Sequence, residues 1–550
     1  MKKIDWLIVF LILVASFILL KDLFKAGLYT SHDGVHQVVR FFYFDQALAD
    51  GQFPPRWAQG LINGFGYPLF IFSYHLPWFI AEVIRFLGFS IIDSVKYTFL
   101  AGFIFSGLTM YFLQRDLFGR LAAVAGTALY LLAPYRFSNI FVRASIGDAT
   151  AFIFAPLVFW SLVKLKEKVG WKWEVLGSLS VAGLILSHAM VAALFLSIFG
   201  LYFLFSLPTV KNKISYMKFC AFIVLGGFGL SAYYFIPSII ERGNTRFQEL
   251  MNQIFVGNYF AGINDLIYSK WGYGVFHSKE GAMSIQLGLI QWLVVLLTII
   301  YLLKILIFDK KISAEKKKLV REGIILVILF IFVIFMMLPV SLPVWKMVSN
   351  AVFIDFPWRY LAVSVFLASL CTGLLIKILG KGKIILAIIF IISAIYLNRN
   401  HLRINETLPW DLSFILKLEK TTNTYDEYTP KWVKNEYIAE NKPRVEFSGG
   451  RAGIEILKNK SNLLEFSVAA PESGVVRVNT IYYPGWKVFV DGKEEGIDYS
   501  NGLIEFKVGE GRKNVVARFT ETPLRMISNF ITAATLVLFF LPQLRSWKKQ

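Results

Sequence analysis

Acidic, imidazole and guanidinium groups lie close together in one short stretch after the first apolar segment of the chain. Asp33 lies between His32 and His36, and Arg40 follows about one helical turn later. A carboxylate such as that of Asp33 could take the proton of a hydroxyl nucleophile, which is the role of a general base. The "SHDG" start equally fits an N-cap for a helix beginning near Val35. The residues by themselves leave both roles open.

The same stretch carries a weak metal-binding pattern. His32 and His36 are four residues apart, so both could lie on one helix face, with Asp33 between them in the sequence. Two histidines without a further placed ligand leave a divalent metal ion as an open candidate. The sequence therefore names no cofactor.

Cationic and imidazole groups that could bind an anionic leaving group occur at three later positions. Arg143 precedes Asp148 on an expected outer loop, and Arg359 lies at the expected outer end of a helix. Arginine suits bidentate contacts with phosphate, although an arginine at a helix end can also reach for lipid headgroups. His188, at another expected outer helix end, is either a substrate contact or a packed interfacial histidine.

Further candidates for substrate contact lie in the first loop. They combine cations with aromatic rings that could contact a substrate, although aromatic rings also collect at any membrane interface. These candidates are His36, Arg40, Arg56, Trp57 and Tyr67.

The composition indicates which kind of protein must position these groups. The 550 residues are 56% hydrophobic, 16% aromatic and only 17% charged, which is typical of a polytopic α-helical membrane protein. The net charge of +20 is concentrated in short basic segments between apolar runs, such as "KLKEKVGWK", "DKKISAEKKKLVRE" and "KILGKGK". This distribution fits the positive-inside rule, and it argues against a nucleic-acid partner.

We expect about 12 transmembrane helices, with both termini and all the basic segments on the cytoplasmic side. This topology requires the segment 66–88 to lie in the outer interface rather than to span the membrane. Two prolines and two charges also make it a poor span: Pro68, Pro77, Glu82 and Arg85. The helical domain would then be 1–398, with the first outer loop at about 23–94.

The region 399–523 has a different character and is expected outside the membrane. Its runs alternate apolar and polar residues between Pro-Gly, Asp-Gly and Asn-Gly turn signals, which predicts an antiparallel β-sandwich. Before the sandwich, 405–440 predicts a helix and an irregular connection, and after it 524–550 predicts a final transmembrane helix with a basic tail. An aromatic turn could hold an acceptor polymer, although its tryptophan could equally be core: Tyr482, Tyr483 and Trp486.

A resemblance to a known family rests on a series of short motifs in order along nearly the whole chain. They are "HDGVH", "GQFPPRWAQGLINGFGYPLFIFSYHLPW", "APYRFSNIFVRASIGDATAFIFAPL", "LSHAM", "YYFIPSIIE", "WGYG", "FPWRYL", "DEYTPKW" and "YPGWKVFVDGK". The chain resembles prokaryotic membrane proteins called 6-pyruvoyl-tetrahydropterin-synthase-related and the YfhO-like proteins, which are similar to the GT-C glycosyltransferase superfamily. The Pro-Arg-Trp and Gly-Phe-Gly-Tyr-Pro portions carry most of the resemblance.

The resemblance implies transfer of a sugar from a polyprenyl-phosphate donor to a cell-envelope acceptor, on the outer face of a prokaryotic plasma membrane. It implies an acid in the first outer loop as base or metal ligand, which Asp33 matches by position. It also implies a second acid after the third helix, at the place of Asp148. The pterin in the family name implies nothing about mechanism, because that kind of pterin synthase is a soluble zinc enzyme.

Two other functions remain open alternatives. A transporter or flippase of lipid-linked glycans would place ionisable residues near the bilayer midplane. Helix interiors such as "AAVAGTALYLLA" and "AVSVFLASLCTGLL" contain none, which favours an enzyme. A non-catalytic scaffold presenting the β-sandwich would not need Asp33 or Asp148.

Overall fold

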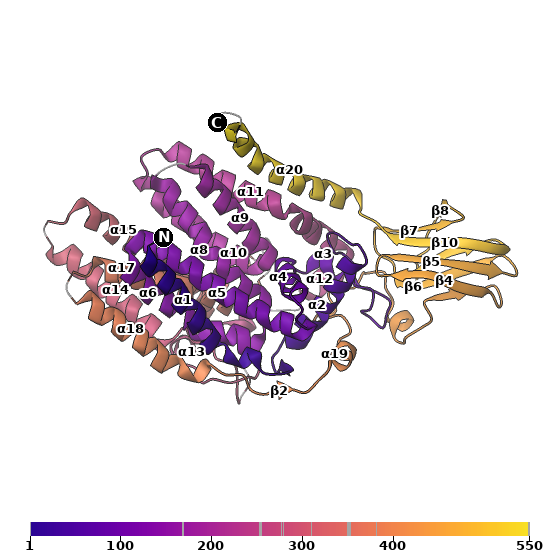
Figure 1. The fold of residues 1–550 in the computed structure, drawn as a ribbon, viewed down its shortest axis with the longest axis horizontal. Helices are drawn as coiled ribbons and strands as arrows, with labels where there is room; N and C mark the ends of the chain where they lie inside the picture. Colours follow the sequence, from indigo (N-terminus) through magenta and orange to yellow (C-terminus); the bar gives the residue numbers. More distant parts are fainter. Residues whose placement is uncertain are drawn as a thin grey trace. The chain divides into compact units, whose positions relative to one another are not determined.

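A computed structural model describes the chain at residues 2–167, 170–251, 256–276, 278, 280–309, 311–348, 354–380 and 382–547. These residues form a helical protein with a C-terminal β domain and a final helix (Figure 1). The chain divides into two compact units. Unit 1 contains Met1–Gly34, Val83–Gly229 and Phe255–Trp410, and unit 2 contains Val35–Glu82, Leu230–Ile254 and Asp411–Gln550.

Unit 1 is built from long apolar helices. Those that run wholly within it are α1 (Lys3–Leu19), α5 (Ile91–Phe118), α6 (Arg120–Leu131), α8 (Ile146–Glu167), α9 (Trp171–Ser187), α10 (Ala189–Ser206), α14 (Leu289–Phe308), α15 (Ala314–Met337), α17 (Leu361–Ile378) and α18 (Lys383–Asn398). Helix α8 packs against α5 and α9, and α6 packs against α5 and α17. A Cβ added at Gly102 of α5 would lie 3.1 Å from the Ala149 carbonyl oxygen of α8, so this glycine permits a close approach of the two helices.

Eight of the described helices are long and apolar enough to cross a membrane. They begin at Ile91, Ile146, Ala189, Lys213, Leu289, Ala314, Pro357 and Lys383. The other four expected spans form α1, α6, α9 and α20 (Pro523–Trp547), with 17, 12, 17 and 25 residues. All twelve expected segments are therefore helical, whereas the number that cross a membrane stays a prediction.

The segment 66–88, expected not to span, contains α3 (Leu69–Phe72) and α4 (Leu76–Phe86). Helices of four and eleven residues are too short to cross a bilayer, since about 20 residues are needed.

Two prolines inside long helices each leave a carbonyl without its helical donor, and a side chain supplies the missing bond. Pro156 of α8 has no N–H for the carbonyl of Phe152, and the Tyr130 hydroxyl donates to that oxygen at 2.9 Å. Pro237 of α11 (Lys213–Ile240) has the same effect on the Tyr233 carbonyl, to which Arg56 Nη1 donates at 2.9 Å. Both helices therefore continue through a proline without an unpaired carbonyl at these positions.

Unit 2 contains two antiparallel sheets. The five-stranded sheet has the order β4-β5-β10-β7-β8, with strands Gly453–Lys460, Leu463–Ala470, Gly511–Phe519, Trp486–Val490 and Lys493–Glu495. The three-stranded sheet has the order β3-β6-β9, with strands Val445–Phe447, Gly474–Ile481 and Leu503–Val508. Alternate residues of β10 are buried, namely Val515, Ala517 and Phe519, as the period-two pattern predicts.

The Asp-Gly signal of the sequence forms a turn between two paired strands of the five-stranded sheet. Strands β7 and β8 are connected by two residues, Asp491 and Gly492, both with positive φ, as a tight hairpin requires.

Before the sheets, the stretch expected to be a helix and an irregular connection contains α19 (Leu412–Leu418). Tyr483 and Trp486 are buried core residues, so they are not an exposed platform for a polymer.

The compact units do not coincide with the expected domains. Residues 35–82 of the first loop and 230–254 group with 411–550 rather than with the helices of unit 1. Trp57, for example, packs edge-on against Trp486 of β7 with ring centroids 5.5 Å apart.

Candidate functional site

A buried ionic cluster in unit 1 joins residues from the ends of several helices, and we call it the Asp148 cluster. Asp148 lies in the first turn of α8, and Arg143 is the last residue of the π-helical segment η2 (Ser138–Arg143) just before it. Arg359 lies in the short helix η7 (Pro357–Tyr360) that leads into α17, and His188 joins α9 to α10. Asp355, four residues before Arg359, completes the cluster.

Asp148 is the centre of the cluster and is fully buried, with 0% of its surface exposed. Its Oδ2 accepts from Arg143 Nη1 at 2.8 Å, and Arg359 Nη1 lies 3.1 Å from Oδ1 and 3.2 Å from Oδ2. His188 Nε2 is 3.7 Å from Oδ1. A buried carboxylate is tolerated only when such partners compensate its charge.

Arg359 divides its guanidinium between two carboxylates. Its Nε and Nη2 donate to the two oxygens of Asp355, each at 2.7 Å, while Nη1 faces Asp148. Arg143 also donates from Nη1 to Asn139 Oδ1 at 2.6 Å and lies 4.9 Å from the Trp358 ring, within the range of a cation–π contact. The two arginines and two aspartates balance one another in charge.

Asp33 is attached to this cluster through the backbone. The Asp33 N–H donates to the Arg143 carbonyl at 3.0 Å, and the His32 N–H donates to the Val142 carbonyl at 2.8 Å. Three residues before His32, strand β1 (Leu28–Tyr29) ends; it pairs with β2 (Thr407–Leu408), and the Tyr29 hydroxyl donates to the Ile140 carbonyl at 2.6 Å. The segment that carries Asp33 is therefore fixed along η2.

The chain turns sharply between Arg143 and Asp148. Ala144 has φ +53°, a left-handed conformation that a residue with a Cβ rarely adopts. The turn brings the guanidinium of Arg143 back onto the carboxylate five residues later. A strained residue held beside a buried ion pair is typical of functional sites.

The two predicted acids differ in what they can touch. Asp33 is half-buried, whereas Asp148 has no exposed surface. The half-buried Asp33 can therefore be reached by a molecule from outside, whereas Asp148 contacts its two arginine partners. Asp148, Arg143, His188 and Arg359, which the sequence analysis gives as candidate site residues, lie together in the structure. Asp355 was not predicted, although an acid four residues before an arginine is a recognisable ion-pair spacing.

The described side chains do not fit a metal ion at the first loop. No group of three or more His, Cys, Asp or Glu in the described residues is arranged to hold one. His32 Nε2 contacts the Tyr273 carbonyl oxygen at 3.0 Å in unit 1, and in unit 2 His36 Nδ1 lies 2.8 Å from Glu419 Oε2. The candidate set His32, Asp33 and His36 therefore gains no support from the geometry.

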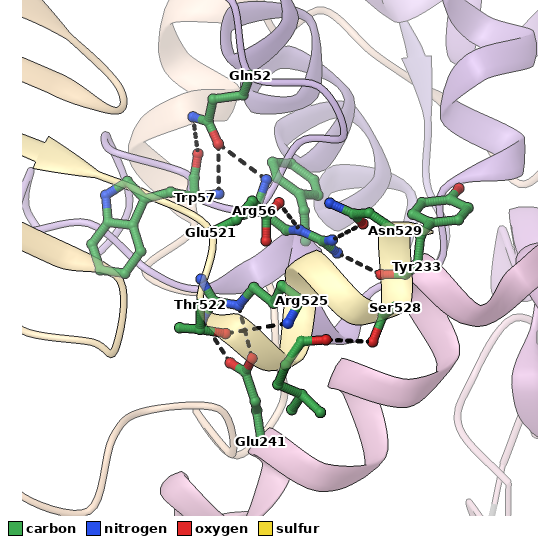
Figure 2. Close-up of polar contacts among 12 residues, drawn as sticks. Gln52, Arg56, Trp57, Tyr233, Glu241, Glu521, Thr522, Arg525, Ser528 and Asn529 are labelled. Carbon is green, nitrogen blue, oxygen red and sulfur yellow. Dashed lines mark hydrogen bonds and ion pairs between the residues drawn. The ribbon is translucent and has the colours of Figure 1, made fainter. Parts of the chain in front are cut away.

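Arg56 is part of a buried polar network in unit 2. Figure 2 shows its guanidinium directed at Glu521, Asn529 and the Tyr233 carbonyl. The Nε of Arg56 donates to Glu521 Oε1 at 3.0 Å, and Nη2 donates to Asn529 Oδ1 at 3.1 Å. Beside it, Arg525 forms a fork with Glu241 at 2.8 and 2.6 Å (Figure 2). Arg56 was a candidate for substrate contact, but in the structure its guanidinium is bound to groups of the protein itself.

The remaining first-loop candidates lie in other parts of unit 2. Trp57 and Tyr67 each have 0% exposed surface, so neither ring presents a face to a sugar. A Cβ at Gly66 would lie 2.5 Å from the Trp57 ring, which explains why the second glycine of the Gly-Phe-Gly-Tyr-Pro motif has no side chain. Arg40 donates through Nε to the Thr422 hydroxyl at 3.0 Å and through Nη2 to the Thr422 carbonyl.

Comparison with known proteins gives distant similarities. No family model matches the chain. An uncharacterized protein of Lactococcus lactis subsp. cremoris (strain MG1363) is 26% identical over 275 residues, which are 48% of this chain and 44% of that protein. The match thus covers less than half of the relative's length.

Two solved structures are similar to parts of the chain. The arabinofuranosyltransferase AftD from Mycobacteria aligns with a TM-score of 0.43 and 12% identity, over 77% of this chain and 27% of AftD. ArnT from Cupriavidus metallidurans, bound to undecaprenyl phosphate, aligns with a TM-score of 0.31 and 13% identity, over 84% of this chain and 97% of ArnT. Similarity at this level establishes no shared activity.

Proposed function

We propose that the chain is a membrane glycosyltransferase that moves a sugar from a polyprenyl-phosphate donor to a cell-envelope acceptor at the outer face of a prokaryotic plasma membrane. The observation that carries the proposal is the connection from Asp148 through Arg143 to Asp33. A reachable carboxylate is held by backbone bonds to a segment whose arginine is anchored on a buried acid. The motif resemblance to GT-C glycosyltransferases supplies the reaction class.

In the proposed reaction Asp33 is the general base. Its carboxylate accepts the proton of an acceptor hydroxyl as that oxygen attacks the anomeric carbon of the donor. The bond between the anomeric carbon and the phosphate oxygen breaks, and its electron pair stays with the polyprenyl phosphate. Negative charge builds on the leaving phosphate, where cationic N–H donors stabilise the transition state.

Arg143 and Arg359 are the proposed cations for that phosphate, with His188 beside them. Each guanidinium carries five N–H donors, and the contacts with Asp148, Asp355 and Asn139 do not use all of them. Asp148 and Asp355 act as positioning residues because they fix the direction of both forks. Other lipid in the membrane and the acceptor glycan complete the proposed partners.

The test is the turnover of a polyprenyl-phosphate sugar by Asp33→Asn in the same detergent as wild type. The substitution keeps size and most capping ability but removes the base, so turnover should fall about 10²- to 10⁴-fold with an unchanged melting temperature. Asp265→Asn, at an exposed aspartate of α13 (Ile263–Ile267), is the matched control and should behave as wild type.

Surface-glycan analysis of a deletion strain complemented with each variant extends the test to the cell. Wild type and Asp265→Asn should restore the missing glycan, and Asp33→Asn should not. Normal transfer by a well-expressed Asp33→Asn protein would remove Asp33 from catalysis.

A further inference from the structure

A cavity of about 370 Å³ lies within unit 2, between the first-loop residues 42–65 and the β-domain residues 441–479. Its volume falls in the range of about 300–1,000 Å³ that ligand pockets occupy. No residue of the Asp148 cluster lines it, because all its lining residues belong to unit 2. The cavity therefore shares no residue with the proposed catalytic site.

Carboxamide side chains make up much of the wall. Each amide offers two N–H donors and one oxygen acceptor, which matches the alternating donor and acceptor character of a hydroxyl-rich ligand. The six amides are Gln46, Gln59, Asn63, Asn441, Asn459 and Asn479.

Three cations line the cavity, and the described lining includes no aspartate or glutamate. The cations are Lys442, Arg444 and Lys460. Burial lowers the pKa of Arg444 to about 10, so its guanidinium is still charged near pH 7. A wall with positive charge and no compensating acid favours a ligand that carries negative charge.

Arg444 has donors that the described residues leave unused. Its Nη1 donates to the Thr480 hydroxyl at 2.6 Å, but its Nε and Nη2 are buried and have no partner among the described residues. The Oδ1 of Asn479, also in the wall, is likewise buried and unpaired there. Buried polar atoms normally have partners, so these atoms need an explanation, which a bound oxyanion and hydroxyl group would supply.

The shape of the wall depends on the first-loop segment that lies between the Pro-Arg-Trp and Gly-Phe-Gly-Tyr-Pro portions. Ile62 and Asn63 have left-handed backbone conformations with φ of 51° and 53°, and Asn63 Nδ2 donates to the carbonyls of Ile438 and Ala439. A Cβ at Gly60 would lie 2.3 Å from the Tyr43 ring, so glycine lets this ring lie against the loop. The left-handed residues of this loop and the close packing of Tyr43 show that the wall has a defined structure.

We infer that this cavity binds an anionic, hydroxyl-rich glycan segment, with the acidic group on Arg444 and Lys460 and the hydroxyl groups on the amides. The acidic group is a sugar carboxylate or a phosphate, which present the same oxygen chemistry to a guanidinium. The inference goes beyond the proposed transferase, because binding requires neither donor nor turnover.

The test is titration calorimetry of the full-length protein in lipid nanodiscs, without donor, with three oligomers: oligogalacturonate, oligo(glycerol phosphate) and a neutral dextran oligomer. At least one anionic oligomer should bind more tightly than dextran. Lys460→Gln, at an exposed end of β4, should weaken that binding about tenfold, the scale of one charged hydrogen bond. Lys507→Gln, at an exposed lysine of β9 outside the cavity, should leave the affinity unchanged.

Arg444→Gln should weaken the same binding at least as much, and a melting-temperature measurement shows whether the variant is folded. Lys460→Gln decides the matter if Arg444→Gln does not fold, since Lys460 is exposed. Absence of binding by both anionic oligomers overturns the inference. Equal binding of dextran, or equal affinity of Lys460→Gln and wild type, overturns it as well. Because no turnover is measured, an inactive transferase with normal glycan binding would count against the proposed function alone.

Discussion

Arg359 satisfies two carboxylates at once, and this distinguishes it from the neighbouring Arg143. Asp355 takes two of its bonds in a fork, and Asp148 takes a third from Nη1. Arg143, by contrast, directs a single nitrogen at both Asp148 and Asn139. Removing one partner of a buried ion pair typically costs about 3–5 kcal/mol, so the geometry of each arginine should govern stability.

Lysine should therefore replace Arg143 much better than Arg359. A lysine ammonium can place one nitrogen near Asp148 and Asn139, but it cannot form the planar fork on Asp355. We expect Arg359→Lys to lose about 1.5–3 kcal/mol, the scale of a charged hydrogen bond, and Arg143→Lys to lose clearly less. Apparent melting temperatures of both variants in one detergent at one scan rate provide the measurement. Equal losses would mean that the fork to Asp355 contributes no stability.

At the scale of elements, the charged groups of the Asp148 cluster lie at helix ends rather than in helix interiors. Asp148 and Arg359 lie at the N-terminal ends of α8 and α17, and His188 lies between α9 and α10. Pro156 interrupts the hydrogen bonding of α8 eight residues after Asp148, and Tyr130 of α6 repairs it. The hydroxyl of Tyr130 thereby ties α6 to the helix that carries the central acid.

Tyr130→Phe should lower stability by about 1 kcal/mol, because it leaves the Phe152 carbonyl buried without a donor while keeping the ring. The matched control is the same substitution in a Pro156→Ala background. Alanine restores the helical N–H to that carbonyl, so the tyrosine hydroxyl is no longer needed there. The four apparent melting temperatures form a double-mutant cycle. A loss of the same size in both backgrounds would contradict this account of the proline.

At the scale of the whole molecule, two groups of ion pairs in unit 1 lie at opposite ends of α8. Asp148 begins this helix and Lys166 lies near its end, about 27 Å away at 1.5 Å per residue. At that end Lys166 pairs with Glu322 of α15 at 2.5 Å, and Lys377 at the end of α17 lies 3.4 Å from Glu315. Three of the basic segments thus meet at the end of unit 1 opposite to the Asp148 cluster, as a cytoplasmic face should.

The proposed topology places Lys317 in the cytoplasm and Lys493 of the β domain outside. Both side chains are exposed, so a cysteine at either position is reachable. In a background with Cys220 and Cys371 replaced by serine, a membrane-impermeant thiol reagent should label Lys493→Cys in intact cells. Lys317→Cys should be labelled only after permeabilisation. Labelling of both in intact cells would exclude the arrangement.

The sequence by itself determined the elements and the chemistry that they could carry. Apolar runs of span length became helices, and alternating runs with an Asp-Gly turn became paired strands, because burial and turn geometry act locally. Residue types and positions at expected helix ends or in the outer loop also suggested Asp33, Arg143, His188 and Arg359 as site residues, whereas Asp148 was suggested by the resemblance to GT-C glycosyltransferases.

Only the tertiary structure decided which of these residues meet and which are merely buried. Trp57 and Tyr67 are core residues, yet an aromatic ring in a core and one at a membrane interface look alike in a sequence. Arg56 was expected at a substrate, but its partners come from positions 233, 521 and 529, far along the chain. The spacing of Asp355 and Arg359 suggests an ion pair, but only the structure places Asp148 against the same guanidinium. Partnership between distant residues depends on packing in three dimensions, which no local pattern of the chain encodes.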